Sequence, residues 1–184
     1  MDLKNILEMI NNGENSYVEF KEEDIKAKEL AEEIVAFANS EGGTILLGVD
    51  DQGNIKGVKD NKIEEKVMNV CRNNCFPNIV PSFYKIKVEG KTIVVVNVSK
   101  GINKPYYTAN HKYYIRVGST KRIASREELL RLFERTGVFH FDISPVEETS
   151  MKDLNIDIIR DYFLKYNTFD LFDESTETVE RILL

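Results

Sequence analysis

A buried helix followed by a buried strand is the feature of this sequence that most limits its fold. Apolar side chains recur at helical spacing across residues 27–39, and Gly42 and Gly43 then stop the helix. The stripe consists of Leu30, Ile34 and Phe37, with Ala31, Val35 and Ala38 beside it. Residues 44–49 follow as an uninterrupted apolar run, which is typical of a central strand. The sequence therefore predicts a layered domain with this strand inside the sheet.

The remaining elements make this an α+β protein with a mixed β-sheet packed by three to four helices. Three more helices are expected: at residues 3–10, at residues 63–75, and between Ser125 and Gly137, where Ser125 and Glu128 match a capping box. Strands are expected at residues 17–21, 83–88 and 92–98, together with a hairpin that joins 106–108 to 113–117. The first strand alternates apolar and polar side chains, so we expect it to be half exposed.

Charge divides the chain into two parts, which we predict to be a domain over residues 1–137 and an acidic region over residues 138–184. The second part has 4 basic and 11 acidic residues, which leaves 21 basic and 20 acidic residues in the first. The second part begins like a linker around Pro145, and Asn155 is a candidate cap for a helix containing Ile156, Ile159 and Phe163. It is expected to be the start of a truncated C-terminal region.

The sequence predicts a cytoplasmic protein without a membrane segment. No apolar run reaches the roughly 20 residues that a bilayer span needs, and the N-terminus lacks the apolar core of a secretory signal. Cys71 and Cys75 are expected to be buried free thiols, and His111 and His140 are not expected to be metal ligands. No phosphate-binding P-loop is present, so ATP hydrolysis by this chain has no support.

Four acidic side chains and a lysine form the first candidate site. Glu14, Glu19 and Lys21 lie at the first strand, and Asp50 and Asp51 follow the central strand. If these strands are neighbours, the carboxylates converge at one edge of the sheet, where Glu14, Glu19 and Asp51 could bind Mg²⁺ or Mn²⁺ and Lys21 could stabilise developing charge. The alternative is structural, because an outward strand face is normally polar and Asp-Asp before Gln-Gly is a common turn.

A basic and aromatic segment forms the second candidate site. Residues 99–126 hold seven basic residues and no acidic one, interleaved with tyrosines, which is a pattern suited to phosphates and exposed bases. One tyrosine of each adjacent pair, Tyr106-Tyr107 and Tyr113-Tyr114, should face the core. The predicted nucleic-acid contacts are Lys104, Tyr107, Lys112, Tyr114, Arg116, Lys121 and Arg122.

Four ordered motifs give the chain a family resemblance. They are residues 14–21 (ENSYVEFK), 36–43 (AFANSEGG), 47–53 (LGVDDQG) and 114–120 (YIRVGST). Together they resemble the Schlafen AlbA-like DNA-binding domain, which in prokaryotes commonly opens transcriptional regulators and proteins named as helicase-related. The resemblance covers nearly all of residues 1–137.

The resemblance also implies an enzymatic alternative. Some animal Schlafen proteins cleave structured RNA such as tRNA with three carboxylates and a divalent cation, and their positions resemble Glu14, Glu19 and Asp51 of this chain. Those enzymes pair two such lobes, whereas this chain contains one, so a homodimer would have to supply the second.

Three hypotheses follow. The leading one is a nucleic-acid-binding module of a larger regulator, whose affinity falls steeply with salt and depends little on base sequence. The second is a metal-dependent endoribonuclease with Glu14, Glu19, Lys21 and Asp51 in its site, whose cleavage Glu19→Gln would abolish without loss of binding. The third is a scaffold for protein contacts.

Overall fold

The computed structural model describes residues 3–134, 155, 157–158, 161 and 165. The chain divides into two compact units, Met1–His140 and Phe141–Leu184. All the helices and strands named below belong to the first unit. The described part of the chain has no helix that is long and apolar enough to cross a membrane.

A four-stranded mixed sheet in the order β1-β2-β5-β4 is the centre of the first unit. The strands are β1 (Val18–Lys21), β2 (Gly43–Leu47), β4 (Ser82–Val88) and β5 (Lys91–Val98). β1 runs parallel to β2, and the other two pairs are antiparallel. β2 lies inside the sheet, as its unbroken apolar run predicts, and β4 and β5 form the predicted hairpin.

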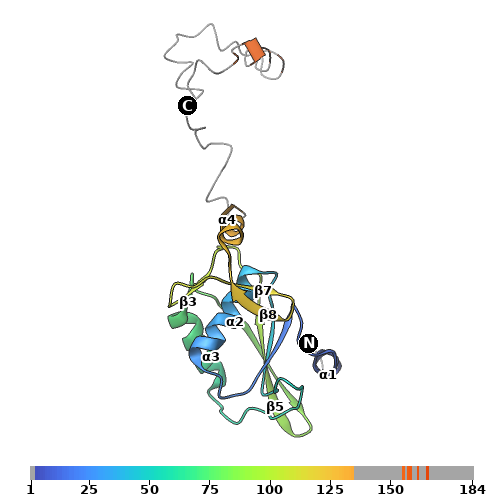
Figure 1. Ribbon diagram of the computed structural model, residues 1–184. Helices are drawn as coiled ribbons and strands as arrows, with labels where there is room; N and C mark the ends of the chain where they lie inside the picture. Colours follow the sequence, from blue (N-terminus) through green and yellow to red (C-terminus); the bar gives the residue numbers. More distant parts are fainter. Residues whose placement is uncertain (1–2, 135–154, 156, 159–160, 162–164, 166–184) are drawn as a thin grey trace. The chain divides into compact units, whose positions relative to one another are not determined.

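Both faces of the sheet are covered by helices (Figure 1). On one face α2 (Ala27–Asn39) and α3 (Ile63–Asn74) pack on Ile45 and Leu47. On the other face α1 (Leu3–Asn12) contributes Ile6 to a cluster with Leu46. Because neighbouring side chains of β2 point to opposite faces, its apolar run supplies both clusters. The predicted α+β class, with a mixed sheet and four helices in the first unit's described residues, is confirmed.

The predicted hairpin between residues 106–108 and 113–117 is wrong. Two separate two-stranded sheets occur instead: β6 (Tyr107–Thr108) pairs with β3 (Cys75–Phe76), and β7 (Tyr114–Val117) pairs with β8 (Thr120–Ile123). The reason is the buried amide of Asn39 at the end of α2, which lies between the two segments. Its Nδ2 donates to the carbonyl oxygens of Tyr106 and Tyr114, at 2.8 Å each, and its Oδ1 accepts from the Tyr106 N–H at 2.7 Å.

The capping box in front of the last helix, α4 (Arg126–Glu134), is confirmed. Ser125 Oγ accepts from the Glu128 N–H at 3.3 Å, and the Glu128 carboxylate accepts from the Ser125 N–H at 2.9 Å. The predicted end of this helix at Gly137 lies outside the described residues. In the second unit, Asn155 Oδ1 accepts from the Ile158 N–H at 3.2 Å, as a helix cap does. The apolar positions predicted for that helix, Ile156, Ile159 and Phe163, are outside the described residues.

Candidate functional site

A chain of buried ion pairs joins the first strand, the core helix and the β7–β8 hairpin. Arg116 of β7 reaches Glu19 of β1 at 2.7 Å and Glu33 of α2 at 3.1 Å. Lys121 of β8 completes the chain with a contact of 2.6 Å to Glu33. The side chains of Glu19, Glu33 and Arg116 are at most 7% exposed. The expectation of a half-exposed first strand is therefore wrong, because the β7–β8 hairpin covers its polar face.

The two terminal nitrogens of the Arg116 guanidinium are bonded within the domain. Its Nη2 donates to the carbonyl oxygens of Asn15 at 2.7 Å and Ser119 at 3.1 Å, and its guanidinium carbon lies 4.6 Å from the centre of the Phe37 ring. Within the described residues, its Nε is buried without a hydrogen-bond partner. A buried charge is tolerated only where it is paired, so the two glutamates are what allow Arg116 to lie in the interior.

The predicted catalytic carboxylates are neighbours in space but differ in environment. Glu19 uses both oxygens, one on Arg116 and the other on Lys21 at 2.6 Å. Burial alone would raise the pKa of Glu19, but the hydrogen bonds from Lys21 and Arg116 outweigh burial and lower it. Glu14 accepts the Phe20 N–H at 2.8 Å, and burial followed by the charges of Glu19 and Asp51 raises its pKa.

The two aspartates after the central strand differ in their contacts. Asp50 organises the turn: it accepts the backbone N–H groups of Gln52 and Asn54, and the Asn54 side-chain amide at 3.0 Å. These hydrogen bonds, led by the Asn54 amide, lower the pKa of Asp50 to about 2. Asp51 is exposed on the same turn.

The predicted metal ligands do not form a metal site in this arrangement. The described part of the chain contains no group of three or more His, Cys, Asp or Glu side chains placed to hold a metal ion. Glu19 also opposes metal binding as it stands, because each of its two oxygens already bonds a cation, Lys21 or Arg116, which neutralises the charge that a metal ion would need. The set Glu14, Glu19 and Asp51 thus does not fit Mg²⁺ or Mn²⁺ as it stands.

Most of the predicted nucleic-acid contacts are engaged inside the domain. Lys104 is buried, and its Nζ donates to the carbonyl oxygens at the C-terminus of α2, those of Asn39 and Ser40. Tyr114 is also buried, and its hydroxyl donates to Glu32 at 3.0 Å. Arg122 is half exposed and pairs with Glu128 at 2.8 Å.

Lys112 and Tyr107 are predicted contacts that are accessible and have no ion-pair partner among the described residues. Lys112 is exposed and Tyr107 is half-buried. The expectation that one tyrosine of each pair faces the core is confirmed, since Tyr106 and Tyr114 are buried.

Tyr107 belongs to a ring cluster that the sequence did not reveal. Its ring stacks with Phe76 at 5.6 Å and with His111 at 5.9 Å between ring centres, and Tyr113 lies 5.5 Å away in a tilted arrangement. A tight turn brings His111 back over Tyr107, because the His111 N–H donates to the Thr108 carbonyl at 2.7 Å and His111 has a φ of 56°. We call Phe76, Tyr107, His111 and Tyr113 the ring cluster.

Sequence comparison identifies the domain. The model of the family described as Schlafen, AlbA_2 matches residues 14–125. The chain belongs to this family. Three of the four motifs of this Schlafen AlbA_2 domain now have structural explanations. Asn39 in 36–43 bridges Tyr106 and Tyr114, and Arg116 in 114–120 fastens β7 to Glu19 in 14–21.

Solved structures agree on the fold. The DIP2311 protein from Corynebacterium diphtheriae matches with 21% identity and a TM-score of 0.52 over 65% of this chain, which spans only 24% of that protein. The second is the N-terminal domain of a Nitrosomonas europaea protein that is named as related to the ATP-dependent DNA helicase RecG. It matches with 28% identity and a TM-score of 0.50, covering 66% of this chain and 90% of that domain. No protein with a curated description matches the chain.

Proposed function

We propose that this Schlafen AlbA_2 domain is a nucleic-acid-binding module, and that the ring cluster with Lys112 is its principal contact surface. The observation that carries the proposal is a set of four rings, each exposed or half-buried, with an exposed lysine in the turn between two of them. Aromatic rings beside a cation suit nucleic acid because every base has a face that can stack. The helicase-related name of the Nitrosomonas europaea neighbour supports the same class of ligand.

The cations contribute less than the sequence predicted. Lys104 is buried against carbonyl oxygens and Arg116 is paired with carboxylates inside the domain, so we leave both out of the contact set. Lys121 and Arg122 are 21% and 46% exposed and could exchange their carboxylate partners for phosphates, since partly exposed ion pairs are weak. With Lys112 that gives three phosphate contacts, for which the logarithm of affinity should fall with the logarithm of salt concentration with a slope of about −2 to −3.

Fluorescence anisotropy tests this proposal. A labelled nucleic-acid strand is titrated with the protein at several salt concentrations. Lys112→Ala should weaken binding and make the salt slope shallower by about one unit. Lys87→Ala is the matched control, because Lys87 is an exposed lysine on β4, away from the ring cluster. An affinity that is independent of salt and unchanged by Lys112→Ala would contradict the proposal.

Metal-dependent cleavage of structured RNA stays a second candidate. In its favour, the charges of Glu19, Lys21 and Asp51 all act on Glu14, and desolvated carboxylates with raised pKa values are common at functional sites. Against it, both oxygens of Glu19 are already bonded to Lys21 and Arg116. The test is a denaturing gel of labelled tRNA incubated with Mg²⁺ or Mn²⁺ and with a chelator.

Asp51→Asn is the informative variant in that assay, because Asp51 is exposed and its replacement leaves the core intact. Metal-dependent products that disappear with Asp51→Asn would establish the nuclease, and intact tRNA would remove it. The scaffold and homodimer hypotheses stay predictions, for which light scattering measures the oligomeric state.

A further inference from the structure

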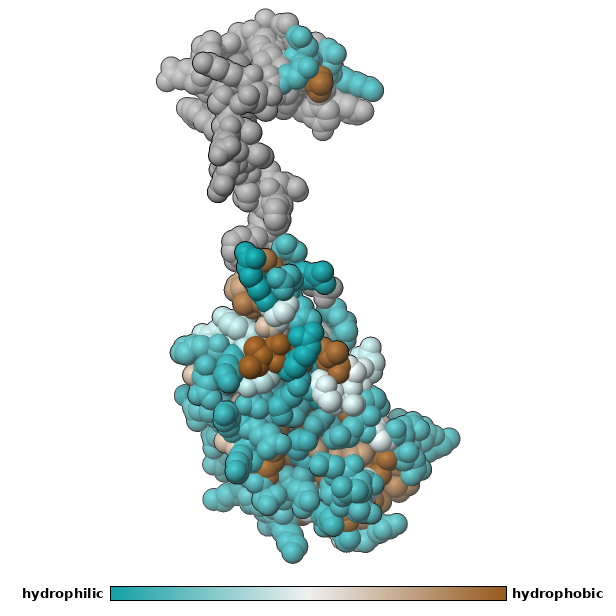
Figure 2. All heavy atoms as spheres, in the orientation of Figure 1, coloured by the Kyte–Doolittle hydropathy of each residue, from teal (hydrophilic) through white to brown (hydrophobic). Residues whose placement is uncertain are grey.

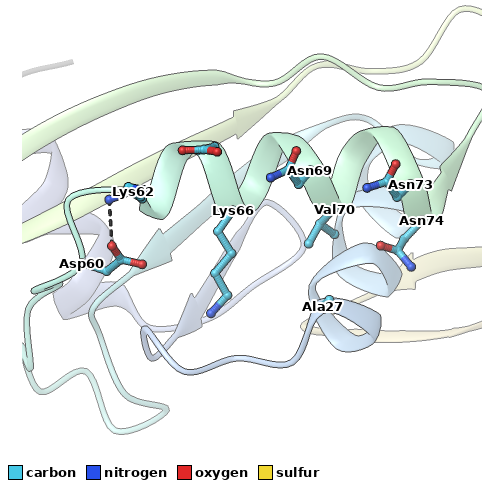
Figure 3. Close-up of a pocket in the computed structure, with 9 residues that line it drawn as sticks. Ala27, Asp60, Lys62, Lys66, Asn69, Val70, Asn73 and Asn74 are labelled. Carbon is cyan, nitrogen blue, oxygen red and sulfur yellow. Dashed lines mark hydrogen bonds between the residues drawn. The ribbon is translucent and has the colours of Figure 1, made fainter.

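A polar groove runs along α3 beside the start of α2. It has a volume of about 450 Å³. It is lined by Ala27, Asp60, Lys62, Glu65, Lys66, Asn69, Val70, Asn73 and Asn74. Figure 3 shows Lys66, Asn69 and Asn73 following one another along the helix. Their spacing of three and four residues places them on one side of α3.

The groove offers hydrogen-bonding amides more than net charge. Its two lysines are balanced by Asp60 and Glu65, and Lys66 already donates to the Glu23 carbonyl at 3.0 Å. Asn69 and Asn73, by contrast, are exposed, and neither side-chain amide has a hydrogen-bond partner among the described residues. An amide presents a donor and an acceptor side by side, which matches the edge of a base rather than a phosphate.

Asn74 connects the groove to the ring cluster. Asn74 ends α3, β3 follows without a loop, and its Phe76 is a member of the cluster. The Asn74 carbonyl also accepts the N–H of Ala109, from the turn that carries His111, at 3.0 Å. The amides on α3 and the stackable rings are thus linked through Asn74, and we treat them together as one candidate surface.

We propose that this surface binds an unpaired nucleic-acid strand, with bases stacked on the ring cluster and base edges hydrogen-bonded by Asn69 and Asn73. This inference rests on the proposed function and narrows it to single-stranded ligands. Base faces and pairing edges are accessible only where a strand is unpaired, whereas a duplex would present phosphates to a groove whose charges cancel. Adenine is the preferred base, because an asparagine amide can bond it in a bidentate manner.

Anisotropy with the full chain tests the inference on three labelled probes: an adenine-rich single strand, a pyrimidine single strand and a hairpin duplex. Replacing both Asn69 and Asn73 by alanine removes the amides at exposed helical positions where alanine is the best helix former, so the domain should keep its melting temperature. The matched control replaces Asn11 and Asn12, which are exposed at the end of α1 on the opposite face of the sheet.

The expected result is that the adenine-rich strand binds about tenfold more tightly than the duplex, and that the Asn69 and Asn73 double variant removes most of that difference. The control variant should bind like the unchanged protein. Two results would overturn the inference while leaving nucleic-acid binding intact. One is equal affinity for the adenine-rich strand and the duplex, and the other is a double variant that binds the adenine-rich strand like the unchanged protein. Failure to bind any of the three probes would instead overturn the proposed function itself.

Discussion

The buried cations and three of the four rings of the ring cluster come from the same short stretch of chain and yet have opposite environments. Arg116 and Lys104 carry the charges expected at a nucleic-acid surface, but both lie inside and hold the domain together. Tyr107 and Tyr113 carry the apolar rings expected in a core, but both are partly open to solvent. The comparison teaches that residue type in this segment does not indicate location. Carboxylates of β1 and α2 bind Arg116 in the interior, and carbonyl oxygens at the end of α2 bind Lys104 there.

The largest expected effect comes from removing one partner of the buried ion pairs, and it is the loss of stability in Glu19→Gln. The change leaves Arg116 buried with one carboxylate fewer, which should lower the free energy of unfolding by about 3–5 kcal/mol. Urea unfolding measures the effect. Glu22→Gln is the control, since Glu22 is exposed next to the same strand. Equal stability of the two variants would mean that the network does not support the fold.

This prediction also changes how the nuclease hypothesis should be tested. Glu19→Gln would lower cleavage by destabilising the domain even if Glu19 took no part in chemistry. Loss of activity in that variant is therefore uninformative unless its stability is measured alongside.

A second and smaller effect is expected at the ring cluster. Tyr107→Ala removes the ring that contacts Phe76, His111 and Tyr113, and should weaken binding of a single strand by about 1–3 kcal/mol. Tyr84→Ala is the matched control, because Tyr84 is an exposed tyrosine on β4. If both variants bind equally well in anisotropy titrations, the ring cluster is not the contact surface.

The smallest expected effect is a gain in stability, in contrast to the loss in Glu19→Gln. The raised pKa of Glu14 means that its ionised form is less favourable in the folded protein than in the unfolded chain. Ionised Glu14 therefore costs stability at pH values above its ordinary pKa of 4.5, and the cost disappears as the pH falls below that range. Glu14→Gln keeps an oxygen for the Phe20 N–H and should raise the melting temperature at pH 7 by about 1–2 °C, because solvent screens a half-buried charge.

Melting curves of Glu14→Gln and of the unchanged protein at pH 7 and pH 4 check this sign. The gain should shrink at the lower pH. A variant that is less stable than the unchanged protein at pH 7 would contradict this prediction, because it would show that the Glu14 charge stabilises the fold.

Local signals in the sequence were sufficient for most of the fold. The helix over residues 27–39, the hairpin of β4 and β5 and the capping box at Ser125 each depend on residues close in the chain, and all three are present. The pairing of β3 with β6 could not be predicted, because two-residue strands carry no periodicity and their partners lie far apart in sequence.

The candidate site was less predictable for a physical reason. Arginine and lysine are seldom fully buried, so the sequence favoured an outward position for Arg116 and Lys104. Their burial depends on acceptors from other elements, Glu33 and the carbonyl oxygens at the end of α2, whose proximity only the fold supplies. Phe76 was missed for the same reason, since only the pairing of β3 with β6 brings it to Tyr107.

The central claim is that the ring cluster with Lys112 is the principal nucleic-acid contact surface, and that the buried Arg116 takes no part in binding. The most direct measurement is an NMR titration of the isotopically labelled chain with an unlabelled single strand. Our account predicts that the largest amide shifts occur in residues 107–113 and along α3, with little change at Arg116. Shifts confined to β7 and β8, with an unperturbed ring cluster, would contradict it.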